Sequence, residues 1–207
     1  MVRALLAALM VVALAGCGSS GESGSPVTGV KISDDDGYHG IYLDKTYAVP
    51  DLALTDTAGK PFDLATRPKR TLVFFGYSNC PDICQVVMST LAAAVAKLSV
   101  EQRDQVQVAF VTTDPARDTK AVLRRYLDRY NKDFVGVTGP LKTIVALGKP
   151  MGIDVLKGQK LASGGYEVEH TTNVIAVRGG QGDLVWTAST SPTDLADDLK
   201  KILEADA

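Results

Sequence analysis

A continuous apolar run near the middle of the chain, Thr71–Gly76 (TLVFFG), constrains the fold more than any other feature of the sequence. The run lacks the apolar–polar alternation of a strand with one solvated face. It is typical of a central strand that is buried on both faces of a sheet. We therefore expect a sheet with this strand in its interior.

Strand and helix patterns alternate around this run. Further strands are expected at Asp51–Asp56, Pro61–Leu64, Val106–Thr113, Thr172–Val177 and Asp183–Ala188, the last two joined by a Gly-rich hairpin turn at 179–182. Helices are expected at Asp82–Leu98, Asp118–Tyr130 and Leu141–Leu147, and from Pro192 or Thr193 to about Leu203. This order predicts an α/β thioredoxin-like fold, with a central mixed sheet flanked by helices.

The first residues have the composition of an export signal. Arg3 precedes an apolar run from Ala4 to Ala15, which is too short to span a bilayer comfortably and fits a signal peptide. The run ends in Leu14-Ala15-Gly16-Cys17, which is similar to the bacterial lipobox, where a peptidase cuts before a lipid-modified cysteine. The alternative is a leader that is cut elsewhere, with Cys17 discarded.

These observations predict three parts of the chain. Residues 1–16 form a lipoprotein signal peptide, residues 17–43 a flexible tether rich in Gly, Ser and Asp, and residues 44–207 the folded domain. A chain of 207 residues suits one domain with an appendage. We expect the protein to be anchored by lipid on Cys17 to the extracytoplasmic side of the cell membrane.

The charge pattern argues against a nucleic-acid partner. The formal net charge is −2, and we interpret the Lys and Arg residues as scattered along the chain rather than clustered. No surface for nucleic acid and no polybasic membrane patch is expected from this pattern.

Two cysteines remain after Cys17 is assigned to lipid. Cys80 and Cys84 follow the first buried strand and stand at the start of the first long helix, where a four-residue separation places both sulfurs on one face. The helix N-terminus is expected to lower the thiol pKa values, which favours both redox reactivity and metal binding. The inert alternatives are a disulfide that adds little stability, because its loop is short, and a pair of buried small side chains.

One imidazole of the predicted domain completes a candidate metal site. Thioredoxin-type oxidoreductases have two residues between their cysteines, whereas this chain has three. Thiolates suit Cu(I), and an added imidazole suits Cu(II). His170 ends a long segment, Lys149–Glu169, which we expect to be an inserted loop. In a thioredoxin-like layout His170 lies across from the helix that carries the cysteines, whereas His39 is expected to be solvated in the tether.

Four segments resemble motifs of the Sco family, also called SenC, whose members are copper-binding proteins that assemble cytochrome c oxidase. They are Phe75–Cys84 (FGYSNCPDIC), Thr113–Thr119 (TDPARDT), Phe134–Gly139 (FVGVTG) and Glu169–Thr171 (EHT). The resemblance runs from about Leu52 to Leu203. Gln85 and Lys120 depart from the family pattern, because many members have Pro at these two positions. The departures bear on local helix geometry and not on copper binding.

The resemblance implies a function and a set of site residues. Cys80, Cys84 and His170 are implied as ligands of Cu(I) and Cu(II), and Asp114 is expected to orient a ligand or a loop from outside the coordination sphere. Capping of the helix that follows is an equal alternative for Asp114, although Asp118 is the stronger candidate for that cap. The implied function is that of an extracytoplasmic copper metallochaperone for the binuclear copper centre of a cytochrome c oxidase subunit. Its partners would be that subunit, another copper chaperone and, through the lipid anchor, the membrane.

Three other functions stay open at this point. A thiol–disulfide oxidoreductase that reduces the copper-ligand cysteines of the oxidase subunit would need Cys80 and Cys84 but not His170. A copper or redox sensor would use the same residues and report to a partner. A peroxidase fits less well, because such enzymes on this fold use a single peroxidatic cysteine. Enzymatic activity is therefore left open, with a non-enzymatic chaperone favoured.

Overall fold

The apolar run at the middle of the chain forms the interior strand of an eight-stranded sheet. The computed structural model describes residues 37–160 and 166–206, and Cys17 lies outside the described residues. The strands of this sheet are β1 (Ile41–Ala48), β2 (Ala53–Asp56), β3 (Pro61–Asp63), β4 (Arg70–Gly76), β5 (Val106–Thr112), β6 (Val135–Thr138), β9 (Val174–Arg178) and β10 (Gln181–Trp186). Their order in the sheet is β1-β10-β9-β4-β5-β6-β2-β3.

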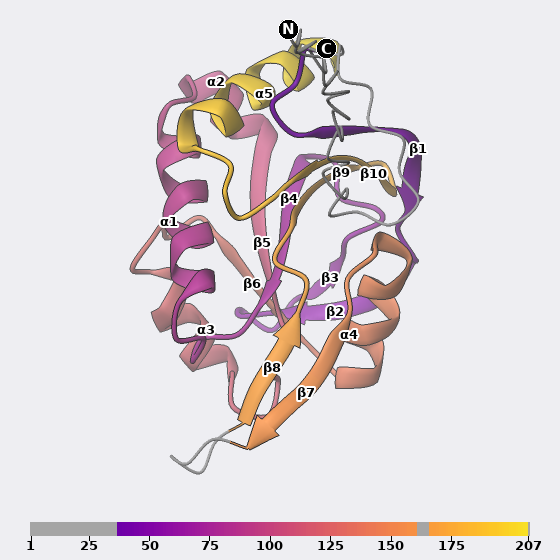
Figure 1. Cartoon of the computed structure of the whole chain (residues 1–207), viewed down its shortest axis with the longest axis vertical. Helices are drawn as coiled ribbons and strands as arrows, with labels where there is room; N and C mark the ends of the chain where they lie inside the picture. The colour runs from indigo at the N-terminus through magenta and orange to yellow at the C-terminus, as the bar shows by residue number, and fades with distance from the viewer. Residues whose placement is uncertain (1–36, 161–165, 207) are drawn as a thin grey trace, which may run out of the picture.

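The sheet is mixed. β4 pairs in parallel with β5, and β5 pairs in parallel with β6. β9 and β10 form an antiparallel hairpin beside β4, and β1 adds to its outer edge. The helices are α1 (Ile83–Ala96), α2 (Val100–Gln105), α3 (Lys120–Leu127), α4 (Leu141–Gly148) and α5 (Pro192–Ala205), with a 3₁₀ turn η1 at Lys149–Met151. This arrangement, seen in Figure 1, is the predicted α/β thioredoxin-like fold.

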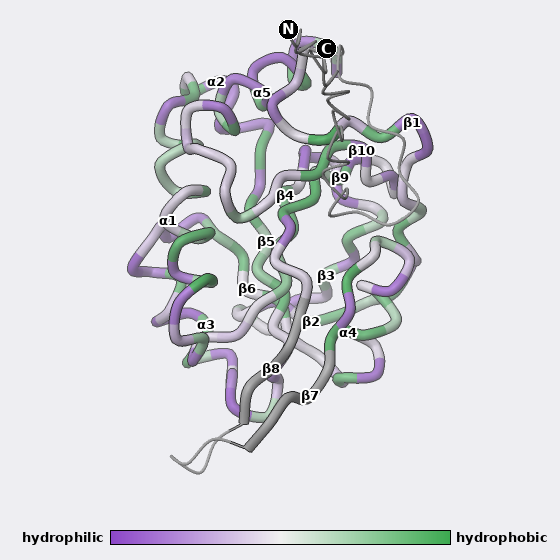
Figure 2. Tube along the Cα trace, in the orientation of Figure 1, coloured by the Kyte–Doolittle hydropathy of each residue, from purple (hydrophilic) through white to green (hydrophobic). Residues whose placement is uncertain are grey.

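Helices cover both faces of the sheet, and β4 packs against both layers. Leu72 and Phe74 of β4 lie in an apolar cluster with residues of α1, α3 and α5, whereas Val73 and Phe75 lie in a second cluster with residues of α4. All seven residues of β4 are buried, and Figure 2 shows hydrophobic residues along β4 and β5 and a mixture of hydrophobic and hydrophilic residues on the helices. Alternate side chains of one strand thus hold the two layers together.

The domain begins earlier than expected. β1 starts at Ile41, three residues before the predicted domain start at Asp44, and Leu43 is 2% exposed. His39 also belongs to the fold, because its backbone N–H donates to Asp198 Oδ1 at 2.9 Å. Its side chain is about half exposed, with Nδ1 3.9 Å from Asp194 Oδ1. The sequence did not predict β1, because its polar residues interrupt the alternation typical of a strand. It forms a strand because it pairs with β10.

The segment expected as an inserted loop is largely a hairpin. β7 (Val155–Lys160) and β8 (Tyr166–His170) pair as a separate two-stranded antiparallel sheet. Two other short elements, α2 and β6, were not predicted as elements either. α2 is short but is stabilised by a capping box between Ser99 and Gln102. Within the described residues, no helix combines the length and the apolar character that crossing a bilayer requires.

A buried arginine ties the start of β4 to the C-terminal region. Arg70 is 3% exposed and donates from Nη1 to both carboxylate oxygens of Asp183, at 2.7 and 2.8 Å. Its Nη2 donates to Asp206 Oδ1 at 2.6 Å, and Arg178, which is more exposed, contacts the same Asp206 at 2.8 Å. The network fixes the end of α5 against the sheet.

Candidate metal centre

The two cysteines lie at the carboxyl end of β4, where the chain turns into α1. Cys80 precedes the helix, and its N–H donates to the carbonyl of Tyr77 at 3.2 Å. Asp82 caps α1 by accepting from the N–H of Ile83, and Cys84 lies in the first turn. The sulfurs are therefore not both on the helix, as the four-residue spacing suggested. They are still brought together, because the Cys84 N–H donates to Cys80 Sγ at 3.4 Å.

Both sulfurs are buried, and both residues are thiols rather than a disulfide. Cys84 has no exposed surface, and Cys80 is 5% exposed. Gly76, at the end of β4, permits this packing. A Cβ at that position would lie 2.9 Å from Phe74, 3.0 Å from Phe110 and 3.1 Å from Cys84 Sγ. The sulfur of Cys84 is thus enclosed by aromatic rings and backbone.

The expectation of lowered thiol pKa values is wrong for Cys84. Its hydrogen bond with Cys80 raises the pKa of Cys84 well above the ordinary value for a thiol, and burial raises it further. A backbone hydrogen bond from Tyr77 lowers this pKa but is outweighed. Cys84 is therefore a neutral thiol at pH 7, because the helix N-terminus does not compensate for burial.

A buried carboxylate holds the loop that carries Cys80. Asp118 accepts from the backbone N–H of Ser78 at 3.0 Å, from the Ser78 hydroxyl and, at 2.7 Å, from the Thr112 hydroxyl. It does not cap α3, as predicted. That cap is Thr119, whose hydroxyl accepts from the N–H of Val122 at 3.3 Å. The sequence signal for these bonds was a hydroxyl residue at or just after the end of each of two buried strands, with an acidic residue six positions after the second hydroxyl.

Asp114 contacts the cysteine loop through an arginine. Its carboxylate is buried and accepts from Arg117 Nε. The guanidinium carbon of Arg117 lies 5.9 Å from the centre of the Tyr77 ring, three residues before Cys80. Asp114 therefore does not cap α3 either. Its expected role in orienting a ligand or a loop stays a prediction.

The backbone of His170 lies at the end of β8. It pairs with Val155, which packs against the apolar cluster that contains both cysteines. The next residue, Thr171, donates from its N–H to the carbonyl of Asp154 at 3.4 Å. The imidazole of His170 lies outside the described side chains. Among those that are described, no group of three His, Cys, Asp or Glu residues forms a metal site. The three-ligand set therefore stays a prediction.

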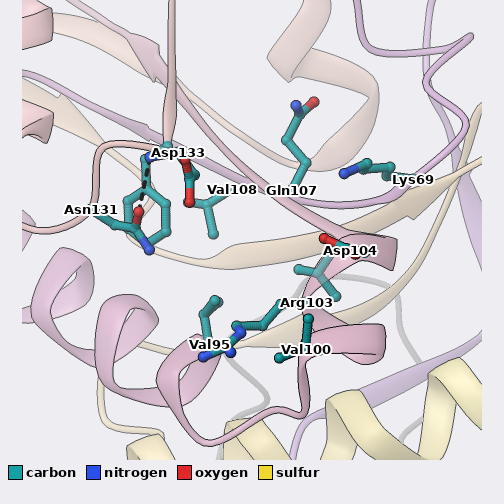
Figure 3. A pocket seen from close by; sticks show the side chains of 11 residues that line it. Lys69, Val95, Val100, Arg103, Asp104, Gln107, Val108, Asn131 and Asp133 are labelled. Carbon is teal, nitrogen blue, oxygen red and sulfur yellow. Dashed lines mark hydrogen bonds between the residues drawn. The ribbon is translucent and has the colours of Figure 1, made fainter.

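A separate cavity lies at the other end of the parallel strands. It has a volume of about 420 Å³ and is lined by, among others, Val100, Arg103, Gln107 and Phe134 (Figure 3). β5 begins at Val106, beside this cavity, whereas the cysteines follow the carboxyl end of the neighbouring parallel strand β4. The cavity is therefore not part of the candidate metal centre.

We predict that Asp118→Ala loosens the cysteine loop. The substitution leaves the donors of half-buried Ser78 and buried Thr112 without their acceptor, and we expect the free energy of unfolding to fall by on the order of 3 kcal/mol. Asp118→Asn keeps one acceptor oxygen, so its free energy of unfolding should fall by less. Denaturant unfolding measures stability, and the rate at which a thiol reagent modifies Cys80 measures release of the loop.

The matched control is Asp128→Ala. Asp128 is exposed and pairs with Arg124, so this change should alter stability by no more than ~0.5 kcal/mol and leave the rate of Cys80 modification unchanged. Equal rates of modification in Asp118→Ala and the wild type would show that Asp118 does not hold the loop.

Comparison with known proteins shows the family to which this chain belongs. The family model described as SCO1/SenC matches residues 43–204. A protein of Stutzerimonas stutzeri, described as copper-binding, is 35% identical over 145 residues, which are 70% of this chain and 70% of that protein. The apo Sco1 protein of Thermus thermophilus superposes with a TM-score of 0.72 and 30% identity, covering 80% of this chain and 96% of the other. Bradyrhizobium japonicum ScoI with copper bound superposes with a TM-score of 0.67 and 27% identity, covering 74% and 98%. The chain belongs to the SCO1/SenC family.

Proposed function

We propose that this protein is an extracytoplasmic copper chaperone that carries copper on Cys80, Cys84 and His170. It would deliver that copper to the binuclear copper centre of a cytochrome c oxidase subunit. The observation that carries the proposal is the contact between the two cysteines, in which the backbone N–H of Cys84 donates to Cys80 Sγ, in a family with copper-bound members. Copper is here the cargo of the protein.

The donor set suits copper in both of its oxidation states. Two soft thiolates are sufficient for Cu(I), and an imidazole supports Cu(II). Both thiols must lose their protons to bind the metal, so copper competes with protons at Cys84. Cys80 retains a little exposed surface and Cys84 none, so a ligand of the client would reach the copper from the side of Cys80.

Location and client are part of the same proposal. The lipobox-like residues that end in Cys17 support a lipid anchor, which would hold the domain beside a membrane-embedded client. Sco proteins are linked to the assembly of cytochrome c oxidase, which supports an oxidase subunit as the client.

A second candidate function is thiol–disulfide exchange with the cysteines of the client. The observation that favours it is again the proximity of the two thiols, which could close into a disulfide. The raised pKa of Cys84 and its full burial act against it, because the thiolate is the reacting species. A metal displaces the proton directly, and the chaperone function is therefore the better supported.

Replacing His170 with alanine separates the two functions. We expect His170→Ala to lose Cu(II) affinity and the thiolate-to-Cu(II) charge-transfer absorption, while Cu(I) binding by the two sulfurs is largely retained. Disulfide reductase activity should not change. Titration of the reduced protein with each copper ion, followed by absorption spectroscopy, measures the first two.

The control is His39→Ala, which removes the other, half-exposed imidazole of the chain. It should bind both copper ions like the wild type. Unchanged Cu(II) affinity and absorption in His170→Ala would overturn the copper site, and a substantial reductase activity independent of His170 would support the enzyme.

A further inference from the structure

Helix α3 and the turn after it carry a local excess of positive charge. Residues 117–133 contain six basic and three acidic residues, a local net charge of +3 in a chain whose net charge is −2. The basic residues are Arg117, Lys120, Arg124, Arg125, Arg129 and Lys132. They were not recognised as a cluster in the sequence, because buried and half-buried residues separate them. We call the exposed members Lys120, Arg125, Arg129 and Lys132 the α3 patch.

The acidic residues nearest in sequence do not neutralise the α3 patch. Asp118 is fully buried beneath it and is bound to Ser78 and Thr112. Asp128 pairs with Arg124 instead, and Asp133, the third, is exposed next to Lys132 but forms no ion pair with a described residue. Lys120, Arg125 and Lys132 form no ion pair with another described residue. The patch therefore presents positive charge to solvent.

The backbone that carries the α3 patch is tied together, and one of the four patch side chains is held against a ring. Arg124 donates to the carbonyls of Phe134 at 2.7 Å and Asn131 at 3.4 Å, which ties the turn after α3 back to the helix. The guanidinium carbon of Arg129 lies 4.9 Å from the centre of the buried Tyr126 ring. Arg129 therefore loses less side-chain entropy on binding than an arginine without such a contact would.

The α3 patch adjoins the metal centre. Asp118, two residues before α3, holds the loop of Cys80, and Tyr126 of α3 packs in the same apolar cluster as Cys80 and Cys84. The chain enters the described domain at another place, next to α5. Gly40 donates to Asp198 of α5 at 2.8 Å, and Figure 1 shows α5 and α3 at opposite ends of the molecule. The chain therefore enters the described domain at the end opposite the α3 patch.

We propose that the α3 patch is the docking surface for a protein partner whose surface around its copper-accepting site is acidic. This rests on the copper-delivery function proposed above and adds the charge of the partner and the face that it approaches. Opposite charge beside the two sites steers the encounter and sets the register, and its effect is mainly on the rate of association. An anionic membrane is the less favoured occupant, because α3 lies far from the entry of the tether.

The test reverses two charges of the patch. In Arg125→Glu/Lys132→Glu both residues are exposed, so packing is preserved; Arg129 is left intact because it stacks on Tyr126. The matched control is Lys142→Glu/Lys149→Glu, the same charge change on exposed positions in and next to α4, which covers the other face of the sheet. Full-length protein in nonionic detergent is mixed with the labelled copper-accepting domain of the oxidase subunit, and association and copper transfer are recorded separately against ionic strength.

We expect the α3 variant to associate about tenfold more slowly than the wild type at low salt, within the range known for electrostatic steering, and the difference to vanish at high salt. The control should associate like the wild type, and transfer at saturating partner should be unchanged in both. Equal association rates for the α3 variant and the control, or no association of the wild type, would overturn the docking surface.

Two further outcomes distinguish the parts of the proposal. Association that depends on the α3 patch without any copper transfer would support the docking surface and contradict the chaperone function. In the second outcome, the wild type binds phosphatidylglycerol vesicles more strongly than phosphatidylcholine vesicles. If the α3 variant lost that preference but still associated with the client, the patch would be assigned to a membrane and the proposal overturned.

Discussion

Replacing Cys84 with serine is expected to abolish copper binding in both oxidation states. A serine hydroxyl does not ionise near neutral pH and is a hard donor, so the variant would offer Cu(I) a single thiolate. The loss should exceed the ~10–100-fold that removal of a hydrogen-bond partner of a ligand costs in metal proteins. Titration against a chromophoric Cu(I) chelator measures it, and Cys80→Ser should behave in the same way.

Stability provides the control for this prediction. Cys84 is fully buried beside Phe110, so a serine hydroxyl there also destabilises the fold, whereas Cys80→Ser places its hydroxyl in the loop before α1. Because Cys80 keeps a little exposed surface, we expect Cys80→Ser to lose less stability than Cys84→Ser, to stay folded and still to fail to bind copper. Retention of tight Cu(I) binding by a well-folded Cys80→Ser protein would contradict the two-thiolate site.

The core of the fold could be predicted from the sequence because its signals are local. The run at Thr71–Gly76 is mostly apolar, as a strand between two helix layers requires. β4 forms where this run predicted a strand. The helix at Pro192 starts where Ser191 can cap it, and the structure has that cap. Each of these elements follows from residues that are close together in the chain.

Other features depended on partners far away in the chain. β1 is a strand because β10 pairs with it, and its own residues alternate weakly. The pairing of β7 with β8 is likewise a property of two segments, neither of which has a strong strand pattern. Short edge elements of this kind are stabilised by context more than by propensity.

The candidate site shows the same division between local and distant information. The Cys80–Cys84 pair and its place at the start of α1 could be predicted, because spacing and helix capping are local. The raised pKa of Cys84 could not, since it results from burial by residues of several elements. The bond from Ser78 to Asp118 spans 40 positions, so Asp118 was interpreted as the nearest available helix cap. Burial and long-range hydrogen bonds set the chemistry that the motif alone left open.

Replacing Arg70 with methionine is expected to cause the largest loss of stability among the substitutions considered. The change removes the guanidinium that Asp183 and Asp206 share and leaves two largely buried carboxylates without their main partner. Breaking a buried ion pair in this way costs about 3–5 kcal/mol. For a domain of this size, that corresponds to a melting temperature lower by about 6–20 °C. Calorimetry or thermal circular dichroism measures the shift.

Arg178→Met is the matched control for this substitution. Arg178 contacts the same Asp206 but is 42% exposed, so its loss should cost no more than ~1 kcal/mol. Equal destabilisation by the two variants would show that the buried network contributes no more than a surface ion pair.

The same network predicts how the difference between Arg70→Met and the wild type depends on pH. Burial alone would raise the pKa of Asp206, but hydrogen bonds and charge from Arg70 and Arg178 outweigh it and lower this pKa below its ordinary value. A carboxylate with a lowered pKa in the folded state stabilises the fold fully above its unfolded pKa, near 3.9, and the contribution is lost as the pH falls through the folded pKa. Removal of Arg70 takes away the main cause of the lowered pKa of Asp206. The stability gap between the two proteins should therefore be constant near neutral pH and narrow below about pH 4, and a gap that stays constant down to about pH 2 would contradict this account.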